Sequence, residues 1–200
     1  MSDSLSAAIL AGGQSSRMGT NKALAQVAGK PIIERVIERV RPLVDELVIV
    51  TNTPEVYAWL GLPAFADLIP GKGPLGGLYT AVSSTRSQHT LAVSCDQPFL
   101  NAEVLRYLTG LRAGFDVVVP LAPDGYPQSM QAVYSKACLG PIRARIDADR
   151  LKVIGFFPDV RVREVPAGEI AHLDPERNSF VNVNTPEDLA EAERLAALLG

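Results

Sequence analysis

The chain has 200 residues, 47% of them hydrophobic, which is enough apolar material to bury one sizeable core. Its net charge of −3 and isoelectric point near 5.4 exclude an overall basic field, so we expect no nucleic-acid partner and no anionic membrane surface. No signal-like segment opens the chain, and no apolar run approaches the roughly 20 residues that cross a bilayer. We therefore expect a cytoplasmic protein with one domain.

Cysteines and histidines offer little chemistry here. Cys95 and Cys138 lack the spacing of a zinc site, and two cysteines in a chain of this length make no disulfide framework. We expect both to be buried free thiols. His89 and His172 form no evident pair with a serine or cysteine nucleophile, so the sequence predicts no covalent intermediate.

The first notable feature is an apolar strand, residues 5–10, that runs into a glycine-rich, cationic stretch. Gly12 and Gly13 admit backbone geometries that a Cβ forbids, Arg17 offers a bidentate fork, and Lys22 offers a mobile charge. Amide groups of such a loop can converge on phosphate oxygens. The stretch matches neither the dinucleotide-binding nor the P-loop pattern, so a phosphate site and an ordinary glycine turn both stay open.

The rest of the chain alternates between strand and helix patterns. Lys30-Pro31 opens a helix that continues to residue 40, Asn101 caps a helix that includes residues 104–111, and Thr185 caps the last helix at Pro186. Short or regular helices are also expected at 56–60, 76–83 and 141–148, and strands at 46–50, 64–68, 90–94, 116–119, 130–134 and 160–165.

Two details of this pattern bear on the fold. Residues 130–134 follow an Asp124-Gly125 turn and are expected to return antiparallel, whereas residues 167–179 are expected to be irregular. The alternation favours an α/β fold of three layers, Rossmann-like, with a mostly parallel sheet and one antiparallel strand. Functional loops of such sheets lie at the carboxyl ends of the strands.

Asp96 directly follows the predicted strand 90–94 and therefore lies at that edge. A carboxylate there can hold Mg²⁺, which usually keeps several waters and is shared with substrate phosphate oxygens. Capping of the helix after Pro98 accounts for an aspartate equally well. From the residues alone, the two interpretations stay open.

Four stretches, taken in order, resemble the molybdenum cofactor guanylyltransferase (MobA) family, which belongs to the nucleotidyltransferases with an LAGGxSxRMGxxK signature. They are Leu10 to Lys22, Gly73-Pro74-Leu75-Gly76-Gly77, Cys95-Asp96-Gln97-Pro98-Phe99-Leu100 and Asn182-Val183-Asn184-Thr185-Pro186-Glu187-Asp188-Leu189. Together they span nearly the whole chain. The resemblance implies a single nucleotidyltransferase domain over residues 1–200 with the fold of that family.

The resemblance also implies an activity. The terminal phosphate of Mo-molybdopterin would attack the α-phosphorus of Mg²⁺-bound GTP, giving the guanine dinucleotide cofactor and pyrophosphate. Arg17, Lys22 and Asp96 would be catalytic, with Asp96 as the metal ligand, and Asn182 and Asn184 would line the side that receives the pterin. The implied GTP contacts are Leu10, Ala11, Gly12, Gly13, Lys22, Asn52, Asp67, Gly73, Pro74, Leu75 and Asp96.

Several alternatives stay open. Related cytidylyltransferases resemble LAAG where this chain has Gly12, so Gly12 favours the larger guanine, but a cytidylyltransferase for the same pterin or a sugar-phosphate nucleotidyltransferase uses the same chemistry. A non-catalytic module that binds nucleotide or pterin is the alternative of another class. Asn21 stands where many family members carry an acidic residue. We expect a monomer that contacts pterin-supplying and acceptor enzymes transiently.

Overall fold

The computed structural model describes residues 4–12 and 21–199, and its main feature is a seven-stranded sheet in the order β5-β4-β1-β6-β8-β7-β9. β8 pairs antiparallel with both β6 and β7, while β1, β4, β5, β6, β7 and β9 run parallel. The strands are β1 (Leu5–Leu10), β4 (Glu46–Val50), β5 (Ala64–Phe65), β6 (His89–Ser94), β7 (Val117–Pro120), β8 (Gln131–Ser135) and β9 (Val162–Val165). The predicted antiparallel strand is confirmed.

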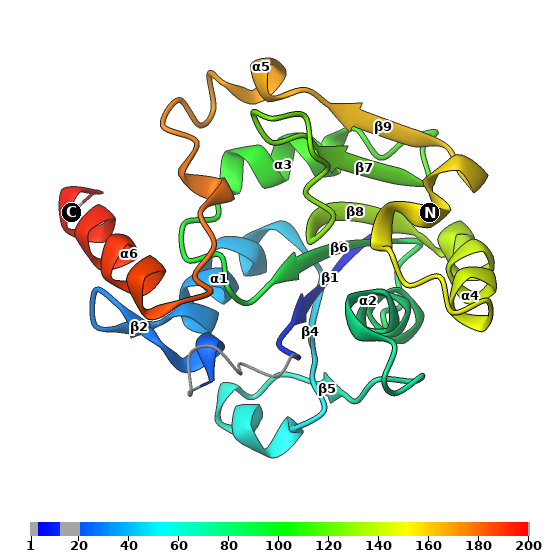
Figure 1. Ribbon diagram of the computed structural model, residues 1–200, viewed down its shortest axis with the longest axis horizontal. Coiled ribbons are helices and arrows are strands. Elements are labelled where there is room, and N and C mark those ends of the chain that lie inside the picture. The colour runs from blue at the N-terminus through cyan, green and yellow to red at the C-terminus, as the bar shows by residue number, and fades with distance from the viewer. Residues whose placement is uncertain (1–3, 13–20, 200) are drawn as a thin grey trace.

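Helices cover both faces of this sheet (Figure 1). They are α1 (Ile32–Val40), α2 (Gly73–Ser84), α3 (Ala102–Gly110), α4 (Leu139–Asp147), α5 (Ala167–Ile170) and α6 (Pro186–Leu199). One apolar core joins α1 and α3 to the sheet, and a second joins α2 and α4 to its other face. The predicted three-layer α/β fold is therefore confirmed. Within the described ranges, no helix combines the length and apolar content that a membrane span requires.

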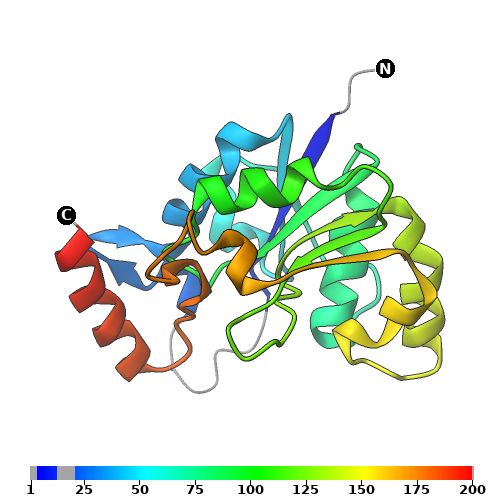
Figure 2. The same ribbon diagram turned by 90° about the horizontal axis from the view of Figure 1, so that it is seen from above.

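A small hairpin precedes α1 and was not predicted. β2 (Gln26–Val27) and β3 (Lys30–Pro31) pair antiparallel across Ala28 and Gly29, whose φ angles are 52° and 71°. Two consecutive residues with positive φ make a type I′ hairpin turn, which usually carries Asn-Gly or Asp-Gly. The hairpin lies beside α6 (Figure 2), and the Ala28 amide donates to Glu193 Oε2 at 3.0 Å.

Among the boundaries that differ from the sequence prediction are those of β5, α2 and α5. β5 ends at Phe65 rather than residue 68, because the amide of Asp67 donates to Asn52 Oδ1 and that of Leu68 to Thr80 Oγ1. α2 begins at Gly73, three residues before the predicted start. Residues 167–170 form α5 inside the stretch that was expected to be irregular.

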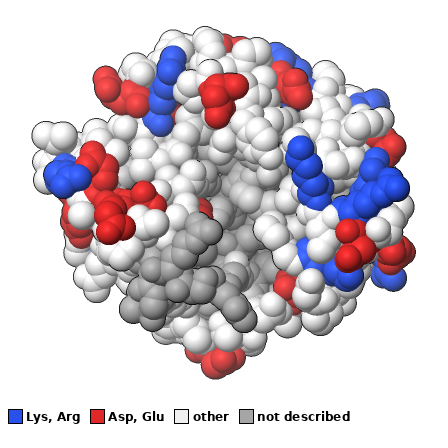
Figure 3. All heavy atoms as spheres, in the orientation of Figure 1, with Lys and Arg blue, Asp and Glu red and all other residues white. Residues whose placement is uncertain are grey.

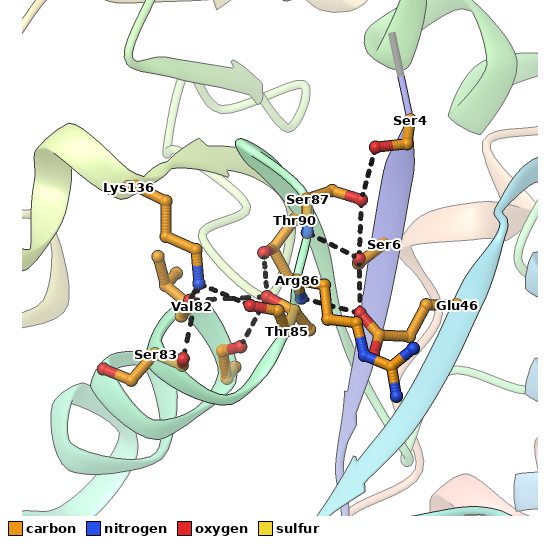
Figure 4. A network of polar contacts seen from close by, with 11 residues as sticks. Ser4, Ser6, Glu46, Val82, Ser83, Thr85, Arg86, Ser87, Thr90 and Lys136 are labelled. Carbon is orange, nitrogen blue, oxygen red and sulfur yellow. Dashed lines mark hydrogen bonds and ion pairs between the residues drawn. The ribbon is translucent and has the colours of Figure 1, made fainter. Parts of the chain in front are cut away.

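Polar contacts hold the amino edge of the sheet together (Figure 4). Ser6 Oγ donates to Glu46 Oε2 at 2.7 Å and contacts Ser87 Oγ at 2.8 Å, which ties β1 to β4 and to the loop before β6. Lys136 Nζ donates to carbonyls at the carboxyl end of α2, among them Thr85 O at 2.6 Å. Such a cation satisfies helix carbonyls that have no partner within the helix. This edge fixes the orientation of α2.

A buried aspartate ties β7 to the start of β9. The Asp116 carboxylate accepts from Arg161 Nε and Nη2, both at 2.9 Å, and from the Arg161 backbone amide at 3.0 Å. The guanidinium hydrogen bond of Arg161 lowers the pKa of Asp116 to about 2. The charged form of this carboxyl is therefore the one that stabilises the fold.

This ion pair predicts a pH-dependent stability. In the unfolded chain a carboxyl titrates near about 4, so the contribution of Asp116 is present above that pH and is lost as the pH falls towards about 2. Asp116→Asn should lower the free energy of unfolding at pH 7, and its difference from the wild type should shrink towards pH 2. Urea unfolding across this range measures it. The exposed Glu176→Gln is the control and should change little; a difference for Asp116→Asn that is constant with pH would contradict the assignment.

Candidate active site at the carboxyl edge of the sheet

The carboxyl ends of β1, β4 and β6 lie side by side at one edge of the sheet. Leu10 is in register with Val50 on one side and with Ser94 on the other. The pairing continues beyond the strands, since Ala11 N donates to Val50 O at 2.8 Å and Cys95 N donates to Leu10 O at 3.2 Å. Figure 3, in the orientation of Figure 1, shows the surface hollowed where these strands end. The structure therefore brings the beginnings of two predicted motifs, at Leu10 and Cys95, to this edge.

Asn52 and Asp67 form a pair on the β4 side of this edge. Asn52 Nδ2 donates to Asp67 Oδ2 at 2.8 Å, and Asp67 N donates to Asn52 Oδ1 at 2.9 Å. A Cβ built on Gly77 would lie 3.1 Å from Leu10 Cδ2 and 3.8 Å from Asp67 Oδ1. The structure thus brings together Leu10, Asn52, Asp67 and the first turns of α2, all predicted for the nucleotide.

The first residues of α2 offer a ligand their backbone rather than their side chains. Gly73 has φ +57°, which few residues other than glycine adopt, and Pro74 follows within the first turn. The Leu75 side chain is fully buried in the core beneath α2, so only its main chain is available to a ligand. Amides in the first turn of a helix carry partial positive charge and suit an anion.

Gly12 lies exposed just beyond β1. A Cβ built on it meets no heavy atom of the described residues within 4 Å. The base preference assigned to Gly12 stays a prediction. Gly13 and Arg17 lie outside the described residues, and their predicted roles stay predictions too.

Asp96 combines a buried carboxylate oxygen with an anchored backbone. Its Oδ1 is buried and makes no hydrogen bond with the described residues, while its backbone oxygen accepts from Val183 N at 2.8 Å. A buried acceptor without a partner is costly, and a bound cation removes that cost. Nowhere in the described parts of the chain do three or more His, Cys, Asp or Glu side chains gather as a metal site.

Lys22 and Asn184, separated widely in sequence, meet at this edge. Lys22 Nζ donates to Asn184 Oδ1 at 2.8 Å. The chain reaches Asn184 directly from Val183, whose amide is bonded to the backbone of Asp96, so both predicted catalytic residues among those described contact one short segment. Asn182 is exposed, and its Nδ2 donates to Phe180 O at 3.0 Å.

Tyr57 was missed by the sequence analysis. Its buried hydroxyl accepts from Asn21 Nδ2 at 3.0 Å and has two alternative acceptors for its single hydrogen, Asn21 Oδ1 at 3.2 Å and Ala11 O at 3.4 Å. Asn21 Oδ1 also accepts from Ala23 N at 3.1 Å and so caps the turn that carries Lys22. An amide can donate to the tyrosine whereas a carboxylate cannot, which gives Asn21 a structural role here. No local sequence signal marks such a long-range partner.

Cys95 lies beside Asp96, and the structure corrects the expectation that its side chain is fully buried. Cys95 as a whole residue is partly exposed, although its thiol is desolvated, whereas Cys138 is buried as predicted. Desolvation by burial and, to a smaller extent, the Asp96 charge together raise the pKa of the Cys95 thiol to about 12. The thiol therefore stays protonated at neutral pH and is no nucleophile.

The chain is similar to known nucleotidyltransferases over nearly its whole length. Residues 7–156 match the family described as MobA-like NTP transferase domain. A protein of Carboxydothermus hydrogenoformans named as a probable molybdenum cofactor guanylyltransferase is 36% identical over 97% of this chain and 98% of its own length. The molybdenum cofactor guanylyltransferase of Desulfosudis oleivorans is 34% identical, over 96% and 95%.

Solved structures show the same fold. The molybdopterin-guanine dinucleotide biosynthesis protein A of Archaeoglobus fulgidus has a TM-score of 0.84 at 28% identity, over 96% of this chain and 99% of that one. CMP:2-keto-3-deoxy-manno-octonic acid synthetase, solved with CTP, has a TM-score of 0.75 at 17% identity, over 98% and 100%, and is similar in fold alone.

The close packing of α2 predicts that Gly76 tolerates no side chain. A Cβ there would lie 2.9 Å from Lys72 Cβ and 3.2 Å from Ile69 O, so the loop before α2 would have to shift. Gly76→Ala should lower the free energy of unfolding by about 1–3 kcal/mol. Gly140→Ala in α4 is the control: a Cβ built there meets no described atom within 4 Å beyond its own helical turns, so the change should be neutral or stabilise by about 0.4–1 kcal/mol. Urea unfolding of both variants measures this, and equal effects would refute the packing argument.

Proposed function

Because the chain belongs to the family of MobA-like NTP transferases, we propose that it transfers GMP from GTP to the terminal phosphate of Mo-molybdopterin. The products are pyrophosphate and the guanine dinucleotide form of the cofactor. The observation that carries the proposal is the convergence of Lys22, Asn52, Asp67, Asp96 and Asn184, from separate parts of the chain, at one edge of the sheet. We also infer that residues 1–200 act as one nucleotidyltransferase domain.

The proposed reaction is a displacement at the α-phosphorus of GTP. A phosphate oxygen of the acceptor forms a bond to that phosphorus, and the bond to the bridging oxygen breaks, so that pyrophosphate leaves with the electron pair. The acceptor phosphate is already anionic, and no general base is required. Positioning and charge neutralisation then supply most of the catalysis.

Two described side chains carry the charge chemistry of this proposal. The ammonium of Lys22 neutralises negative charge that moves towards the leaving pyrophosphate. The buried Oδ1 of Asp96 fits a magnesium ligand, since Mg²⁺ takes one or two carboxylates and completes its shell with water and phosphate. A bound Mg²⁺ would supply further neutralisation of the triphosphate. Arg17, outside the described residues, is proposed for the same charge.

Base choice separates the proposal from its nearest alternative, a cytidylyltransferase acting on the same pterin. The wild-type protein should release pyrophosphate with molybdopterin and GTP and do so far more slowly with CTP, ATP or UTP. A preference for CTP would contradict the proposed guanylyl transfer and would identify the protein as a cytidylyltransferase. Absence of release with every nucleotide would support the non-catalytic binding module.

If Asp96 holds Mg²⁺, removing its carboxylate should reduce turnover much more than it reduces binding of molybdopterin. Asp96→Ala should lower kcat by about 10³-fold or more, since several kcal/mol of charge stabilisation would be lost. Its affinity for molybdopterin should change far less. Pyrophosphate release and equilibrium binding measure the two quantities, and Asp147→Ala on α4 is the control. Near wild-type turnover with Mg²⁺ and GTP would rule out the metal role.

The phosphate role of Lys22 predicts a defect in nucleotide use. Lys22→Ala should lower kcat/KM for GTP by about 10²-fold, the effect of removing one preorganised donor to developing charge. Lys152→Ala, at an exposed lysine, should leave that quantity unchanged. An unchanged kcat/KM for GTP in the Lys22 variant would refute the assignment.

A further inference from the structure

The carboxylate of Asp188 makes contacts that reach beyond the helix that carries it. Asp188 N donates to Thr185 Oγ1 at 3.1 Å, and Asp188 Oδ2 in return accepts from Thr185 N at 2.9 Å. This reciprocal pair is a capping box for α6. The same Oδ2 also accepts from Asn184 N at 2.8 Å, one residue outside that pair.

The hydrogen bond from Asn184 N to Asp188 Oδ2 fixes Asn184, whose side chain accepts a hydrogen bond from Lys22. Asn184 has its amide on Asp188 and its side-chain Oδ1 on Lys22 Nζ, at 2.8 Å each. The preceding amide, Val183 N, is bonded to Asp96 O. The segment 183–184 is therefore pinned between the strand end that carries Asp96 and the first turn of α6.

The contacts leave Lys22 suited to a phosphate. An ammonium has three N–H donors, and the bond to Asn184 uses one of them. The hydrogen bond from the Asn184 amide is the largest of the effects that lower the pKa of Asp188, and the Lys22 charge acts in the same direction. The Asp188 carboxylate and the Lys22 ammonium therefore attract each other, and Asn184 is hydrogen-bonded to both.

We propose that Asp188 is a positioning residue for the transfer: it holds Asn184 in place on the acceptor side, and through Asn184 it sets where Lys22 meets the phosphates of GTP. This inference rests on the proposed function, because it takes Lys22 as the phosphate contact and Asn184 as part of the acceptor side. Asp188 itself touches neither substrate. Its effect on the reaction passes through Asn184.

The two halves of the capping box supply a matched test. Thr185→Ala removes the hydroxyl that accepts from Asp188 N and leaves the Asp188 carboxylate on Asn184 N, whereas Asp188→Ala removes the carboxylate contacts to Asn184 N and Thr185 N and keeps the hydroxyl contact. Both variants should have a lower Tm. Asp188→Ala should also raise KM for molybdopterin and lower kcat, by about tenfold in kcat/KM, while Thr185→Ala stays within about twofold of the wild type. Asp188→Asn, which keeps an oxygen acceptor, should recover most of the loss.

A second measurement tests the route of the effect. If Asp188 acts through Asn184, the double variant Asp188→Ala/Asn184→Ala should be no slower than Asn184→Ala alone, because coupled residues are not additive. Additive losses, or equal kinetics in the Thr185 and Asp188 variants, would overturn the positioning role while wild-type turnover stands. If the wild-type protein releases no pyrophosphate from any nucleotide, the proposed function and this inference fail together.

Discussion

The site depends on the parallel pairing of β1 with β4 on one side and with β6 on the other. Parallel strands end at the same edge, so the residues that follow Leu10, Val50 and Ser94 are brought together whatever their distance in sequence. Ala8 in β1 is small and fully buried, and it packs in one cluster with Ala81 of α2. Short side chains here allow α2 to approach the sheet, which brings Gly77 next to Leu10. Packing of the central strand thus sets the width of the site.

The two edges of the sheet differ in how their polar groups are satisfied. At the amino edge, Ser6, Glu46 and Lys136 have bonded partners in neighbouring elements (Figure 4). At the carboxyl edge, buried side-chain atoms of Asp96 and Gln131 have no hydrogen-bond partner among the described residues. Each such atom costs about 1–3 kcal/mol. The rigid edge offsets part of this cost, and the unsatisfied edge is the one suited to a polar ligand.

Local sequence patterns were sufficient for most elements but not for contacts between them. The apolar runs of β1, β4 and β6 and the Asn101 cap, whose Oδ1 accepts from Glu103 N at 2.8 Å, are visible in short windows of sequence. The Ala28-Gly29 turn was missed because alanine seldom adopts positive φ. The Asn52 to Asp67 pair depends on strand order, which short windows do not contain.

The same distinction divides the site into two parts. Asn52, Asp67 and Asp96, proposed for GTP, follow β4, β5 and β6, whose ends are fixed by the sheet itself. Asn184 has no strand beneath it and takes its position from a hydrogen bond to Asp188 and from that of Val183 to Asp96. Contacts of this kind can change between relatives without disturbing the sheet. The sheet therefore determines where the nucleotide half of the site lies, while the position of the acceptor half depends on how α6 is attached to the rest of the protein.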